Sequence, residues 1–163
     1  MTVYKLFRCK NGDSNLYPLY VLASKPCPRN KVLKAECGKL LDATHVKASG
    51  CGGKLRLRGG WHSTTVPFTD WIGKRDKDGT LIQRKDTVWC ECEVLGNQIE
   101  CNLKNGFEMV PQDSWYYFKT NSKQKEPWII SDKIIIKRTL SDAEVEEICK
   151  ANGYEPQRKE VVA

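Results

Sequence analysis

The chain has 163 residues, 40% of them hydrophobic, and carries 27 Lys/Arg against 20 Asp/Glu, a formal net charge of +7. This length and apolar content are typical of one globular domain and exclude a disordered chain. No segment approaches the roughly 18 apolar residues of a transmembrane helix, and the first residues lack the apolar core of a secretory signal. We therefore expect a cytoplasmic protein without membrane contact, whose eight cysteines are reduced thiols.

The positive charge is concentrated at the start of the chain. Residues 1–60 hold twelve Lys/Arg against Asp13, Glu36 and Asp42, a balance of +9, whereas residues 61–163 hold fifteen basic and seventeen acidic side chains, a balance of −2. Such asymmetry attracts anions, namely nucleic acid, nucleotide phosphates or an acidic protein surface. The alternative is that the lysines only keep the protein in solution.

The first predicted elements form a β-hairpin. Residues 3–8 are rich in β-branched and aromatic side chains, residues 10–13 carry a turn signal, and residues 16–22 are predicted to be the second arm. Residues 24–53 carry few signals, although residues 32–41 are compatible with a short helix.

The next segments are predicted to be short strands and a loop. Residues 54–58 alternate between basic side chains and leucine, which predicts a strand with one basic face. Residues 61–67 are also β-prone. Residues 70–86 are polar and predict a surface loop with a turn at Asp78-Gly79.

Three stronger strand signals follow. Residues 87–94 form the clearest strand pattern of the chain, and residues 115–119 give a second one. Residues 128–138 give a third, which Ser131-Asp132 interrupts.

The C-terminal part predicts a helix. Ser141 and Glu144 have the spacing of a capping box, and Gly153 stands where a helix would end. We therefore predict a single α+β domain over residues 1–154, with a mixed or antiparallel sheet of about six strands and a C-terminal helix. Residues 155–163 are expected to be a flexible tail.

Two carboxylates accompany an indole on the strongest strand. Trp89, Glu91 and Glu93 share one face of it, and Cys90 and Cys92 share the other. The carboxylates could serve acid/base or electrostatic chemistry. The alternative is an ordinary half-buried strand whose acidic face pairs with the basic strand predicted upstream.

Residues 59–65, Gly-Gly-Trp-His-Ser-Thr-Thr, are a second candidate site. The two glycines would let a ligand approach the backbone, and an aromatic ring, an imidazole and three hydroxyls follow. His62 is the more natural general base or nucleotide contact of the two histidines, because His45 stands in a weakly patterned segment. The alternative is a turn that leads into a strand.

The order Arg8, then Ser63, Thr64 and Thr65, then Glu91-x-Glu93 resembles the arginine, serine–threonine–serine and Glu-x-Glu pattern of one class of ADP-ribosyltransferases. The resemblance implies an enzyme in which Arg8 and the hydroxyl residues hold NAD and Glu93 stabilises the reacting ribose. In that reading, Arg8, His62 and Glu93 would be the catalytic residues.

A basic ribbon with an aromatic neighbour favours binding instead of catalysis. Cations interleaved with aromatic side chains can follow a phosphate backbone and stack on bases. The residues with this pattern are Lys47, Lys54, Arg56, Arg58 and Trp61. Binding of this kind requires no cofactor.

The cysteine spacing predicts no metal site. Structural zinc sites use Cys-x2–4-Cys pairs, which neither of the two cysteine groups contains. These groups are Cys37, His45 and Cys51, and Cys90, Cys92 and Cys101.

Segments 4–8, 16–20, 60–62 (Gly-Trp-His), 88–94 and 127–131 resemble a group of small uncharacterised proteins carried by phages and mobile elements of gut anaerobes. The resemblance implies the cytoplasm of a bacterial host and a role against host defence, such as that of an anti-CRISPR. We therefore expect a phage or mobile-element protein that binds an anionic partner: nucleic acid, a nucleotide or a host nucleoprotein complex. The alternative is the NAD-using enzyme.

Overall fold

The structure, a computed structural model, describes residues 1–9, 15–18, 35–43 and 58–161. Five strands form the larger sheet in the order β2-β1-β7-β11-β3, and all its pairings are antiparallel. These strands are β1 (Thr2–Cys9), β2 (Leu16–Pro18), β3 (Leu40–Asp42), β7 (Thr87–Leu95) and β11 (Lys133–Thr139).

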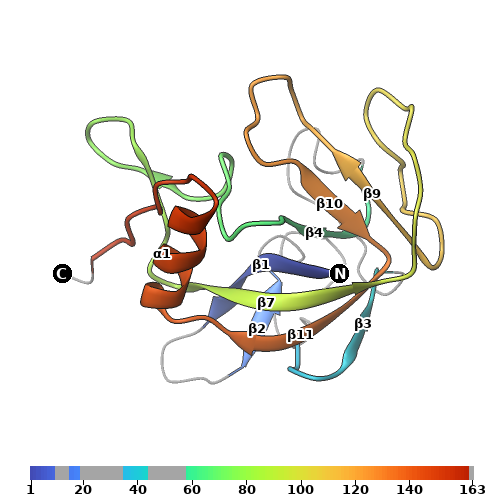
Figure 1. Cartoon of the computed structure of the whole chain (residues 1–163), viewed down its shortest axis with the longest axis horizontal. Helices are drawn as coiled ribbons and strands as arrows, with labels where there is room; N and C mark the ends of the chain where they lie inside the picture. Colours follow the sequence, from blue (N-terminus) through green and yellow to red (C-terminus); the bar gives the residue numbers. More distant parts are fainter. Residues whose placement is uncertain (10–14, 19–34, 44–57, 162–163) are drawn as a thin grey trace, which may run out of the picture.

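Figure 1 shows a smaller sheet above the larger one. Its order is β4-β10-β9-β8, with a parallel pairing only between β8 and β9. These strands are β4 (Trp61–Ser63), β8 (Asn97–Gln98), β9 (Ser114–Phe118) and β10 (Trp128–Ser131). The strands β5 (Lys74–Arg75) and β6 (Leu81–Ile82) form a separate hairpin.

The two sheets are joined where the chain bends from one into the other. At Gly96 the chain passes from β7 to β8 with φ +95°, and a Cβ there would lie 2.3 Å from the carbonyl oxygen of Asp113, so only glycine fits. At Asp132 the chain passes from β10 to β11, and the buried Asp132 Oδ2 accepts a hydrogen bond from the Asp113 amide at 2.8 Å. Such bends produce the corners of packed sheets.

The larger sheet packs against other parts of the chain on both faces, because apolar side chains alternate between the two faces of its strands. Cys90 and Cys92 point into the core between the sheets, as predicted, whereas Trp89 points the other way. There Trp89 packs with Val145 and Cys149 of the helix α1 (Asp142–Ala151). The indole is therefore part of a second core and does not stand beside the two glutamates in solvent.

The predicted capping box is confirmed at the start of α1. Ser141 Oγ accepts from the Glu144 amide at 3.2 Å, and Glu144 Oε2 accepts from the Ser141 amide at 2.8 Å. Gly153, with φ +77°, follows the last turn and donates to the Lys150 carbonyl. Beyond the helix, the Gln83 amide donates to the Arg158 carbonyl at 2.8 Å, so the segment predicted as a tail makes defined contacts.

The fold agrees with the α+β prediction in its antiparallel strands and its C-terminal helix, and strands dominate. The strands are divided among sheets of five, four and two, not gathered into one sheet of about six. The helix predicted over residues 32–41 is wrong in its described part, because β3 pairs Leu40 and Leu41 with Ile135 and Ile134. Among the described residues no helix has the length and apolar character to cross a membrane.

Candidate functional site

Arg58 is the largest side chain that is almost fully buried, with 2% of its surface exposed. Its guanidinium carbon lies 4.6 Å from the centre of the Phe118 ring, a cation–π contact. Its Nε and Nη2 atoms are buried, and within the described part of the chain no acceptor bonds to them. Burial lowers the pKa of the guanidinium, which shows that the fold disfavours its charge.

The segment 103–110 covers Arg58. A Cβ at Gly106 would lie 2.9 Å from Arg58 Cδ and 3.0 Å from the Tyr116 hydroxyl, so only the bare backbone fits. The Phe107 amide donates to that hydroxyl at 3.2 Å. Gly59 also has no room for a Cβ, because that atom would lie 2.7 Å from Met109 Cε. The glycines thus let the chain pack on itself around Arg58.

His62 lies on the same face of the smaller sheet as the rings next to Arg58. His62 pairs with Ile130, Ile130 with Tyr116, and Trp128 with Phe118, and directly paired residues share a face. The imidazole contacts Trp128 edge to face at 5.6 Å between ring centres. We call this group the Arg58–His62 site: Arg58, His62, Tyr116, Phe118 and Trp128.

The imidazole of His62 is held neutral. Burial lowers its pKa to about 3, and the positive charges of Lys5 and Arg58 lower it further, against a hydrogen bond with the Gly60 carbonyl that raises it. The Nε2 atom is buried without a hydrogen-bond partner among the described residues.

Lys5, which is half-buried, brings a second cation to this region. Its Nζ donates to the His62 carbonyl at 2.8 Å and lies 5.6 Å and 5.8 Å from the ring centres of Phe7 and Trp61. Burial of the amine lowers the pKa of Lys5 to about 8.

In the described ranges, Lys5 and Arg58 are the cations without a carboxylate partner that are not exposed, whereas the others that lack one, such as Lys77, are exposed. Lys137 pairs with Glu93 at 3.0 Å, and Arg158 pairs with Asp76 at 2.7 Å. Within the basic first sixty residues, Arg8 and Lys39 also face carboxylates. Lys5 and Arg58 are therefore the cations of residues 1–60 that have no carboxylate partner in the described ranges, and the other eight basic residues of this region lie outside those ranges.

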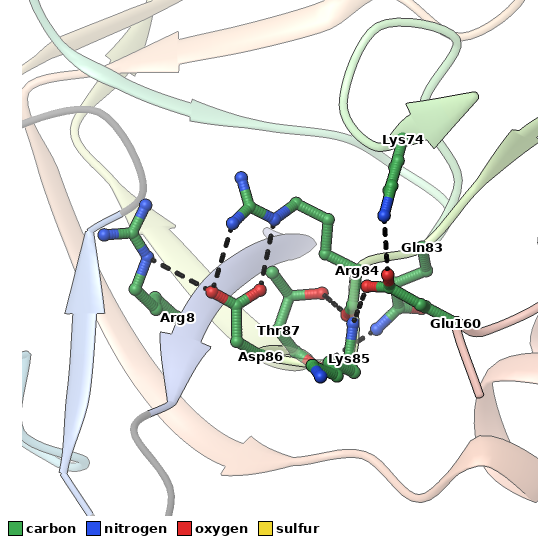
Figure 2. A network of polar contacts seen from close by, with 8 residues as sticks. All are labelled: Arg8, Lys74, Gln83, Arg84, Lys85, Asp86, Thr87 and Glu160. Carbon is green, nitrogen blue, oxygen red and sulfur yellow. Dashed lines mark hydrogen bonds and ion pairs between the residues drawn. The ribbon is translucent and has the colours of Figure 1, made fainter. Parts of the chain in front are cut away.

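Arg8 lies in a network of ion pairs away from the Arg58–His62 site. Figure 2 shows its guanidinium directed at Asp86, with Nε 3.8 Å from Oδ2, while Arg84 Nε lies 3.2 Å from Oδ1 of the same carboxylate. The neighbouring Thr87 hydroxyl donates to the Arg84 carbonyl at 2.7 Å. This network holds the turn that precedes β7.

The structure does not bring Arg8, His62 and Glu93 together. Arg8 pairs with Thr87 and Glu93 with Thr2, six positions away along the same two strands. At about 3.3 Å per residue this places Arg8 and Glu93 roughly 20 Å apart. His62 belongs to the other sheet.

The acidic face of β7 pairs with β11. Lys137 holds the Glu93 carboxylate and lowers its pKa, and Arg138 Nε lies 3.5 Å from Glu91 Oε2. A basic neighbour of this acidic face is thus β11, whereas residues 54–57 of the predicted basic strand lie outside the described residues. Arg58 itself is buried at the smaller sheet.

The three hydroxyls predicted to bind NAD are bonded within the chain. Ser63 donates to the Ile129 carbonyl at 3.2 Å, and Thr64 donates to the Val66 carbonyl at 2.5 Å. Thr65 donates to the buried Glu126, whose other carboxylate oxygen accepts from the Tyr154 hydroxyl at 2.6 Å. This contact raises the pKa of Tyr154 to about 12.

Of the other predicted anion-binding residues, the structure describes Trp61. Lys47, Lys54 and Arg56 lie outside the described residues. Trp61 is buried beside Lys5, so its ring does not present an open face to a base.

Two features of the site were missed from the sequence. In the sequence, Lys5 stands out only as part of a predicted strand, and Phe118 only as one aromatic residue of a later strand. Lys5 is the one charged side chain on the inward-facing set of β1, between the buried Val3 and Phe7. That break in an apolar alternation is a signal the sequence carries.

Comparison of the chain with protein-family models, with curated proteins and with solved structures finds no match. The chemistry of the site therefore has to be inferred from its side chains.

Proposed function

We propose that the protein binds an anionic, phosphate-bearing ligand through the Arg58–His62 site. The observation that carries this proposal is the buried guanidinium of Arg58, whose Nε and Nη2 have no acceptor among the described residues. Buried donors without an acceptor are rare in native proteins, and a bound ion is one of the explanations for them.

The energetic cost of burying the Arg58 guanidinium supports an anion bound beside it. Transfer of an ion from water into a protein interior costs several kcal/mol even after relaxation. The cation–π contact with Phe118 offsets about 2 kcal/mol at most. An anion that accepts from the guanidinium would offset the rest of the cost.

Phosphate oxygens suit the donors that the site offers. A guanidinium presents adjacent N–H groups in a fork that matches two oxygens of one phosphate. Lys5, close enough to affect the His62 imidazole electrostatically, adds a second positive charge. Nucleotides, nucleic acid and a nucleoprotein complex all supply such phosphates, whereas a role against host defence rests on the sequence resemblance alone.

The proposal is tested by thermal shift and calorimetry with inorganic phosphate, AMP and a single-stranded oligonucleotide as probes. A ligand at 100 times its Kd stabilises the folded state by about 2.7 kcal/mol, which corresponds to a rise in Tm of roughly 5–11 °C for a domain of this size. Arg58→Met should abolish the rise, and Lys5→Met should reduce it.

Lys77→Gln is the matched control, because Lys77 is an exposed cation in the turn between β5 and β6. It removes one positive charge and should leave binding unchanged. Equal binding by the wild type and Arg58→Met, or no response to any of the three probes, would contradict the proposal.

A further inference from the structure

Arg58 is out of reach of a ligand while the chain is packed as it is. Its side chain is 2% exposed, and both nitrogens that lack an acceptor among the described residues, Nε and Nη2, are buried. An anion can therefore bind there only after a segment that covers the side chain has moved. The contacts of Arg58 indicate which segment that is.

Two of the described elements contact the Arg58 side chain. Phe118 lies against the guanidinium and belongs to β9, which pairs with β10 and β8 in the smaller sheet. Gly106 belongs to the loop before β9, drawn in yellow in Figure 1, and a Cβ on it would lie 2.9 Å from Arg58 Cδ. Because Cδ is bonded to Nε, the backbone of this loop lies next to a nitrogen that needs an acceptor.

In the described part of the chain, few contacts hold residues 102–107, which we call the strap. Residues 102–105 are exposed. The Gly106 amide donates to the Leu103 carbonyl at 3.1 Å, which closes a turn inside the strap. The described bond between its backbone and the sheet runs from the Phe107 amide to the Tyr116 hydroxyl at 3.2 Å, and the two rings meet edge to face. Segments with so few buried contacts open locally while the rest of a protein stays folded.

Both ends of the strap are fixed. Before it, the Ile99 amide donates to the Trp115 carbonyl at 2.9 Å, and after it the Gly59 amide donates to the Glu108 carbonyl at 2.8 Å. The strap can therefore move away from Arg58 while these pairings remain. β9, in contrast, could uncover Arg58 only by breaking its pairing with β10.

We propose that the strap is a gate, which seals Arg58 in the ligand-free protein and opens to admit the anion. The proposal rests on the proposed function for the ligand, whereas the opening is a property of the free protein and can be measured without one. A protein whose binding-competent state is only partly populated binds its ligand more weakly by that fraction. The closed strap thus lowers the affinity of the site, and variants that open it should bind more tightly.

Gly106→Ala is the informative variant. Its Cβ would lie 2.9 Å from Arg58 Cδ and 3.0 Å from the Tyr116 hydroxyl, and the residue has φ +75°, so the substitution disfavours the closed strap. We expect the open population to rise on the order of tenfold, from the strain of a left-handed alanine alone. Gly79→Ala is the matched control, because Gly79 has φ +79° in the turn between β5 and β6 and nothing lies within 4 Å of its Cβ. It carries the same strain away from Arg58.

Phe107→Ala weakens the strap in a second way. It removes the ring contact with Tyr116, whose ring centre lies 5.1 Å from that of Phe107, and it keeps the backbone amide. Opening should rise several-fold, as expected for the loss of an aromatic pair. Circular dichroism and Tm confirm that each variant is folded, and Phe107→Ala decides if Gly106→Ala does not fold.

Two measurements on the ligand-free protein follow the opening: hydrogen exchange of the Phe107 amide, and modification of Arg58 by phenylglyoxal, located by mass spectrometry. Both should accelerate in the two strap variants and stay at the wild-type rate in Gly79→Ala. The Gly59 amide should keep its protection, which shows that the opening is confined to the strap. The exposed Arg75 should be modified faster than Arg58 in the wild type and at one rate in every variant.

Calorimetry with AMP and with inorganic phosphate links the gate to binding. The affinity of Gly106→Ala should exceed that of the wild type by the factor found in exchange. Modification of wild-type Arg58 as fast as that of Arg75, an equal effect of Gly79→Ala, or faster exchange without a gain in affinity for a probe that binds would each overturn the gate. Absence of binding in every variant, with Arg58 uncovered as expected, overturns the proposed function and leaves the opening of the strap intact.

Discussion

Replacement of Arg58 by methionine is expected to stabilise the ligand-free protein. Methionine keeps the length and much of the apolar volume of the side chain, but it removes a buried charge that has no acceptor among the described residues. Replacing buried charges by apolar residues of similar volume often stabilises a protein by about 1–4 kcal/mol. The lost contact with Phe118 subtracts about 0.5–2 kcal/mol.

The balance of these two effects is centred on a gain of about 1 kcal/mol in the free energy of unfolding. For a domain of this length it corresponds to a rise in Tm of roughly 2–4 °C. Urea denaturation and calorimetry in a buffer free of phosphate and sulfate measure the change. An unchanged dependence on urea concentration shows that the unfolding reaction itself is the same.

Arg58→Lys, which keeps a charge at the site, should not show the gain. A fall in Tm for Arg58→Met, with Arg58→Lys close to the wild type, would refute the reasoning. It would mean that the guanidinium stabilises the fold as it stands and that the site does not lack an anion. A stabilised variant that no longer binds ligand is the stability–function trade-off expected of a binding residue.

Two further predictions concern the fold around the site. The pKa of Lys5 is about 8 in the folded protein and about 10.5 in the unfolded chain. Between these two pH values the unfolded chain binds more protons, so the free energy of unfolding should rise with pH by at most about 3 kcal/mol. Urea denaturation curves of Lys5→Met should lack this rise, and a pH dependence equal to that of the wild type would contradict the burial of the amine. Asp132→Ala should lower the free energy of unfolding by about 1–3 kcal/mol, because the Asp113 amide loses its acceptor at the bend between β10 and β11. Asp132→Asn keeps an acceptor oxygen and should lower it less. If thermal melts show the same loss of stability for both variants, this hydrogen bond does not hold the bend.

Local patterns in the sequence were sufficient where neighbouring residues decide the structure. The capping box at Ser141 and Glu144, the end of the helix at Gly153 and the break at Ser131-Asp132 all appear where the sequence placed them. The alternation of Cys90 and Cys92 with Trp89 also held, because the faces of a strand follow from its period of two.

Tertiary structure alone decided which strands meet, and with it the candidate site. The sequence marked Arg58 and His62, but as an exposed cation and as a possible base. The pairing of β4, β10 and β9 sets the Trp128 ring against His62 and the Phe118 ring against Arg58, and the fold buries Arg58 and the Nε2 atom of His62. Likewise, Glu93 pairs with Lys137, because strand register brings together residues that are far apart in the chain. Short-range periodicity sets the face on which a side chain lies, whereas the charge that it meets there depends on long-range pairing.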